Sequence, residues 1–60
     1  MNLDYITTEF LLESDKETLE NTIRKLESLL EEAEIHSEEY ALICFNLKDL
    51  ENAIKERFDN

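Results

Sequence analysis

Few residues in this chain belong to types that perform chemistry. His36 is its single histidine, and Glu32 and Glu39 lie within about one helical turn of it in the sequence. Histidine and carboxylate side chains can ligate a metal, but two or three of them on a short connection make a weak site. We therefore expect His36 to be an exposed loop residue and expect the chain to bind no metal and no cofactor.

Cys44 is the only cysteine, and the chain has no histidine besides His36 that could act as its general base. We expect this thiol to pack as a small hydrophobic group. The absence of glycine also removes the phosphate-binding loops and nucleophile elbows that depend on it. The sequence thus predicts a protein that is not an enzyme and has no catalytic residues.

Composition narrows the class of partner. The chain has 60 residues, no glycine or proline, and a net charge of −10. Such a length corresponds to one small domain, residues 1–60, and β-rich folds need the missing residues in their turns. The charge disfavours nucleic acid and anionic membrane as partners. The longest apolar run, 40–45, is too short to span a bilayer, and one cysteine fits a reducing compartment, so we expect a cytoplasmic protein.

Two helix starts are visible in the sequence. Ser14 and Glu17 have the spacing of a capping box, and Ser37 precedes two acidic residues that suit a helix N-terminus. Each cap is followed by apolar residues that alternate in steps of three and four, as in a coiled-coil seam. The first set is Leu19, Ile23, Leu26, Leu30 and Ala33, and the second is Tyr40, Ile43, Leu47, Leu50, Ile54 and Phe58. The pattern predicts an all-α fold with an antiparallel two-helix hairpin, about 14–34 and 37–58.

Residues 1–13 are open to two interpretations. Leu3, Ile6 and Phe10 have helical spacing, and Thr7 or Thr8 could cap a short helix. The segment is therefore either a short N-terminal helix that folds onto the hairpin at 14–60 or an arm that a partner orders.

The second helix carries apolar side chains away from the seam. The stretch 40–45 is apolar around its whole circumference, which indicates that it is covered on more than one side. One cover is the first helix, and the other is either residues 1–13 or a different polypeptide. We identify the candidate partner-binding residues as Tyr40, Ala41, Leu42, Cys44 and Phe45.

The connection between the helices is strongly acidic. Residues 26–42 contain no lysine or arginine but six glutamates. This acidic tip either keeps the chain in solution or docks on a basic surface. The second possibility suits an acidic inhibitor, such as an antitoxin or a phage-encoded blocker that mimics nucleic acid.

The chain also resembles a known family. Its second helix is similar to that of the small YscE/PscE-type co-chaperones of type III secretion needle subunits, in residues Tyr40, Lys48, Leu50, Glu51, Ala53 and Ile54. The first helix matches in Leu19, Glu20, Ile23, Lys25 and Leu26. The resemblance covers about residues 15–56. It implies a hairpin that stabilises a larger tetratricopeptide-like chaperone, as a heterodimer or with the needle subunit as a heterotrimer, and so keeps that subunit soluble before export.

Three functions follow from these observations. The first is a helical protein-binding module of the co-chaperone type, and the second is the acidic inhibitor. The third is a structural homodimer in which two hairpins form a four-helix bundle. Since a single layer of two helices has a marginal core, we expect the chain to self-associate when no partner is present.

Overall fold

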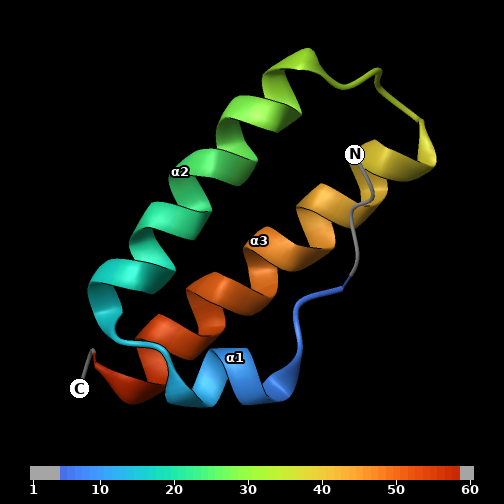
Figure 1. The fold of residues 1–60 in the computed structure, drawn as a ribbon. Coiled ribbons are helices and arrows are strands. Elements are labelled where there is room, and N and C mark those ends of the chain that lie inside the picture. Colours follow the sequence, from blue (N-terminus) through green and yellow to red (C-terminus); the bar gives the residue numbers. More distant parts are fainter. Residues whose placement is uncertain (1–4, 59–60) are drawn as a thin grey trace.

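The computed structural model describes residues 5–58, which form three helices. They are α1 (Thr8–Glu13), α2 (Lys16–Glu32) and α3 (Glu38–Arg57). Helices α2 and α3 run antiparallel, and α1 lies across the C-terminal half of α3 (Figure 1). The all-α hairpin is confirmed, and the N-terminal segment contains a short helix rather than a simple arm. The long helices begin and end within two residues of the predicted bounds.

The core lies between α2 and α3. Leu19 and Leu26 of α2 are buried against Ile43 and Leu50 of α3, as the predicted seam requires. The buried face of α3 is nevertheless wider than that seam, because Ala53 and the polar Asn46 are buried as well. Seam residues on the opposite flank are only partly buried, among them Leu47 and Ile54. The wider face exists because the N-terminal segment packs on the flank of α3 that contains Asn46.

The predicted capping box at Ser14 is wrong. Asp15 is the N-cap of α2, and its carboxylate accepts a hydrogen bond from the backbone N–H of Thr18 at 2.8 Å. Ser14 instead ends α1, where its own N–H donates to the carbonyl of Phe10. The hydrogen bonds from Thr18 lower the pKa of the Asp15 carboxyl below its ordinary value of 3.8. Both residues suit an N-cap by type, and the end of the preceding helix at Ser14 decides between them.

The connection between α2 and α3 is closed by one hydroxyl. Ser37 caps α3 as predicted by accepting from the N–H of Tyr40 at 3.0 Å, while its hydroxyl donates to the carbonyl of Glu34 at 2.7 Å. The N–H of Ser37 also donates to that carbonyl. His36 precedes the cap with a φ of 76°, in the left-handed region that favours glycine. The chain therefore makes this tight turn with an unfavourable residue type.

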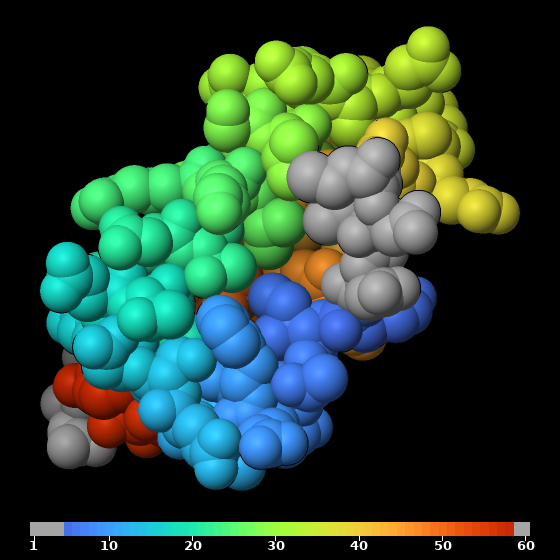
Figure 2. Space-filling model, viewed as in Figure 1, coloured from blue at the N-terminus to red at the C-terminus, as the bar shows by residue number. Residues whose placement is uncertain are grey.

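The N-terminal segment, residues 5–14, lies over part of α3 in the space-filling view (Figure 2). Hydrogen bonds attach it to α3 at two places. Near its start, the N–H of Ile6 donates to Asn46 Oδ1 at 3.1 Å. Near its end, Arg57 Nη1 donates to the carbonyls of Leu11 and Ser14, at 2.5 and 2.6 Å. Thr7 caps α1 by accepting from the N–H of Phe10, as the sequence predicted for Thr7 or Thr8. Helix α1 has no buried residue of its own, so side chains of α3 hold much of this segment in place.

Apolar side chains of the same segment complete the packing. Ile6, Phe10 and Leu11 are half-buried against the hairpin core. Leu3, which the sequence also assigned to this face, lies outside the described residues. The segment thus covers a second flank of α3, but three of the six residues in the apolar stretch 40–45 stay exposed.

Candidate functional site

The structure separates the five predicted partner-binding residues into two groups. Ala41, Leu42 and Phe45 line one open hollow on the surface of α3. Cys44 is exposed, so the prediction that its thiol packs as a small hydrophobic group is wrong, and it lies about 100° around the helix axis from Phe45, outside this hollow. Tyr40 is half-buried on the first turn of α3 and does not line the hollow either. Only the first group therefore forms a shared surface.

This surface, the aromatic hollow, is completed by residues that the sequence did not single out. Its lining consists of Tyr5, Glu38, Ala41, Leu42 and Phe45, around a volume of about 400 Å³. The ring of Tyr5 stands edge-on to the ring of Phe45, with the centroids 5.3 Å apart and an interplanar angle of 82°. Such aromatic pairs contribute about 0.5–1.5 kcal/mol beyond the area that they bury. The contact holds Phe45 in a defined orientation.

The two rings remain largely in contact with solvent despite their pairing. Tyr5 is 66% exposed and Phe45 is 54% exposed. The N-terminal segment therefore borders Phe45 rather than burying it. Of the two covers that the sequence left open, residues 5–14 occupy the flank at Asn46 and Ala53, and the aromatic hollow beside them stays open.

A second hollow, here named the α1 groove, lies farther along α3. Residues of α1 form one wall and residues of the last three turns of α3 form the other, and its lining is Thr8, Leu11, Leu12, Asp49, Asn52, Ala53, Glu56 and Arg57. Leu12 is 62% exposed and is the prominent apolar side chain on the wall that α1 provides. Leu12 belongs to the segment 1–13, which the sequence left open as one possible cover for the stretch 40–45.

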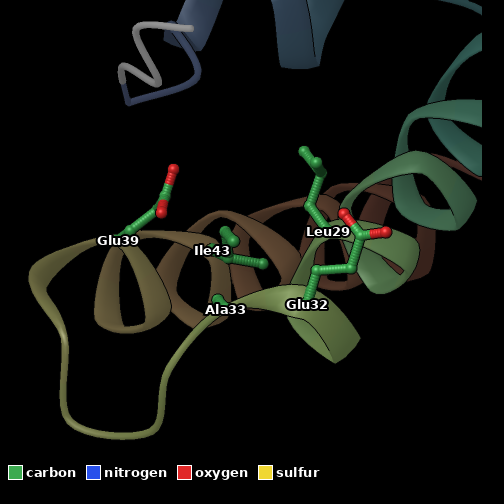
Figure 3. A pocket seen from close by; sticks show the side chains of 5 residues that line it. All are labelled: Leu29, Glu32, Ala33, Glu39 and Ile43. Carbon is green, nitrogen blue, oxygen red and sulfur yellow. The ribbon is translucent and has the colours of Figure 1, made fainter.

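A third hollow, the tip groove, lies between the ends of α2 and α3 that flank the connection. Ala33 and Ile43 lie between the two helices, while Glu32 and Glu39 stand on opposite walls (Figure 3). The side chain of Leu29 completes the lining from α2. The tip groove is therefore an apolar floor with acidic edges.

The structure separates the three residues whose types could ligate a metal. Glu32 and Glu39 belong to the tip groove, whereas His36 is exposed in the connection and is absent from the lining. Within residues 5–58, no group of three or more histidine, cysteine or acidic side chains could hold a metal ion. No helix in that range is both long enough and apolar enough to cross a bilayer.

Exposed apolar side chains are the feature that distinguishes this surface. Besides Tyr5, Leu12 and Phe45, they include Ile35 in the connection, which is 69% exposed, and Phe58 at the end of α3. Ile35 and Phe58 lie at opposite ends of α3, whereas Tyr5 and Phe45 lie together in the aromatic hollow. Exposed apolar side chains that lie together are typical of protein-binding surfaces. Comparisons of the chain with protein-family models, curated proteins and solved structures find no significant match.

Proposed function

We propose that this chain is a non-enzymatic protein-binding module that uses the aromatic hollow to engage a helical partner in the cytoplasm. The observation that carries the proposal is the exposed pair of Tyr5 and Phe45, with rings 5.3 Å apart beside Ala41 and Leu42. Aromatic anchors often dominate the binding energy of an interface. The two rings are already in contact with each other in the free chain, and a preformed pair loses less conformational entropy when a partner covers it.

The most specific form of this proposal is a co-chaperone. The resemblance of residues 15–56 to the needle-subunit co-chaperones of type III secretion suggests a larger tetratricopeptide-like chaperone as the partner. In that role the small chain covers an apolar surface of the larger one, and the heterodimer, or a heterotrimer with the needle subunit, keeps that subunit soluble before export. The exposed rings of Tyr5 and Phe45 support this role because they would supply the apolar cover.

The proposal is tested by purifying the tagged chain from its native cytoplasm and identifying the protein that accompanies it. That protein is then produced separately and titrated calorimetrically with the wild-type chain, Phe45→Ala and Ile35→Ala. Ile35 is a matched control because it is an apolar residue of similar exposure outside the aromatic hollow. We expect a stoichiometric complex with a helical-repeat chaperone, at least tenfold weaker binding by Phe45→Ala (about 1.4 kcal/mol) and no change for Ile35→Ala.

Two other outcomes would overturn the proposal in favour of the remaining functions. Binding to a basic enzyme that is lost when Glu31, Glu32 and Glu34 are changed to glutamine, but not in Phe45→Ala, would identify an acidic inhibitor. A stable dimer of the isolated chain in sedimentation experiments, with no second protein retained, would identify the four-helix-bundle homodimer. Equal binding by Phe45→Ala and Ile35→Ala would likewise place the interface elsewhere.

A further inference from the structure

The aromatic hollow and the α1 groove lie on one continuous face of α3. Glu38, Leu42 and Phe45 line the first, and Asp49, Asn52 and Glu56 line the second. These positions follow one another at steps of three or four residues, so they form a single stripe along the helix. The stripe extends over nearly all of Glu38–Arg57, about 30 Å at 1.5 Å per residue.

The N-terminal segment forms the second wall of both hollows. Tyr5 borders the aromatic hollow, while Thr8, Leu11 and Leu12 border the α1 groove. The hydrogen bonds from Ile6 to Asn46 and from Arg57 to the carbonyls near the end of α1 hold this wall beside α3. We call these two hollows together the α3 groove, and each of them contains exposed apolar anchors: Tyr5 and Phe45 in one and Leu12 in the other.

The charge of this groove is negative. Three carboxylates line it, from Glu38, Asp49 and Glu56. Arg57 is the one cation among the described lining residues, and its Nη1 already donates to two backbone carbonyls. Groups of opposite charge set the specificity of an interface and raise the rate of association. A partner that fits this groove therefore carries basic side chains beside its apolar anchors.

We propose that the partner element is a basic amphipathic helix that lies lengthwise along α3, with apolar side chains on the rings and Leu12 and lysine or arginine opposite the three carboxylates. This inference rests on the proposed function and names the class of ligand for that surface. In helix-in-groove recognition, the bound helix places its apolar side chains at steps of three and four residues, so that they share one face. A second copy of the chain fits poorly, because two molecules with a net charge of −10 repel each other. Anionic membrane is repelled for the same reason.

The experiment uses a synthetic helical peptide of about 20 residues, matched to the length of α3, with leucine on one face and lysine on the other. A peptide with glutamate in place of lysine is the control ligand. Binding to the full chain is followed by fluorescence anisotropy, and the contact surface is mapped by amide chemical shifts. The groove variant is Asp49→Lys with Glu56→Lys, and the matched control is Glu27→Lys with Glu31→Lys, which makes the same change in net charge on exposed positions of α2.

We expect the basic peptide to bind with shift changes along α3 from Leu42 to Glu56, and the acidic peptide not to bind. The groove variant should bind at least tenfold more weakly and the control variant within about twofold of wild type. A milder pair, Asp49→Asn with Glu56→Gln, should show an intermediate loss if the lysine variant folds poorly. Equal losses in the groove and control variants, or shifts confined to one hollow, would overturn the inference. That failure would leave the proposed function standing, because Phe45→Ala is judged on the native partner and not on the peptide.

Discussion

The two packing interfaces of α3 are built in different ways. Against α2, it presents aliphatic side chains at heptad spacing, and Leu19 and Leu50 are completely buried there. Against the N-terminal segment, whose apolar side chains are only half-buried, it adds polar contacts: Asn46 accepts from Ile6, and Arg57 donates to Leu11 and Ser14. Helix α1 contributes no buried residue to the second interface.

This difference assigns separate tasks to the two interfaces. Burial of aliphatic groups is non-directional and provides the main stabilisation of the hairpin. Hydrogen bonds contribute about 0.5–1.5 kcal/mol each but require a defined geometry, so they orient the N-terminal segment more than they stabilise the fold. The position of Tyr5 beside Phe45, and hence the candidate binding surface, depends on that orientation. The comparison predicts that the second interface can be weakened without unfolding the first.

The largest effect is expected from the hairpin core. Leu50→Ala removes a fully buried side chain, and we expect it to destabilise the protein by about 2–5 kcal/mol. Thermal unfolding followed by circular dichroism measures this loss. Leu12→Ala on the exposed side of α1 is the control, with an expected change within about 0.5 kcal/mol. Similar losses in the two variants would show that the core extends into α1 and would contradict the difference between the two interfaces.

A smaller and local effect is expected at Asn46. Asn46→Ala removes the acceptor of the Ile6 N–H, at a cost of about 1–2 kcal/mol. Hydrogen exchange of the amides in residues 6–11 should become faster, while amides in the middle of α2 and α3 keep their protection. Asn52→Ala, the same change at an exposed position of α3, should have neither effect. Uniformly faster exchange in Asn46→Ala would mean that the two interfaces unfold together.

The smallest effect is expected in the connection, which belongs to the hairpin alone. His36→Gly removes the roughly 1–2 kcal/mol cost of a left-handed conformation at a non-glycine residue. Glycine in turn costs about 0.5–1 kcal/mol, because it loses more backbone entropy on folding. We expect a net gain of about 0.5 kcal/mol, seen as a melting temperature higher by about 2–4 °C. Ile35→Gly, at a position without positive φ, should lower the melting temperature. A decrease in both variants would show that the turn is not strained at His36.

The sequence predicted the hairpin because its signals are local. The repeats that contain Leu19, Leu26, Ile43 and Leu50 identify the contacting faces of both helices, and Ser37 marks the start of the second. The choice between Ser14 and Asp15 as the other cap failed because it depends on where α1 ends. Phe45 was found as an apolar residue off the seam, and its partner Tyr5 only as part of the segment 1–13 that could cover it, since an aromatic residue in a short segment has no periodicity to place it.

The amino-acid sequence alone therefore predicts the pair of long antiparallel helices, the acidic connection and the excess of apolar side chains on the second long helix. Which flank of α3 the N-terminal segment covers is visible only in the three-dimensional structure. The contacts that decide it join Ile6 to Asn46 and Leu11 to Arg57, pairs separated by 40 and 46 residues. A helical period reports which side chains share a face, because it arises from local backbone geometry. It contains no information on where a distant segment crosses that face, and here hydrogen bonds to Asn46 and from Arg57 set that place.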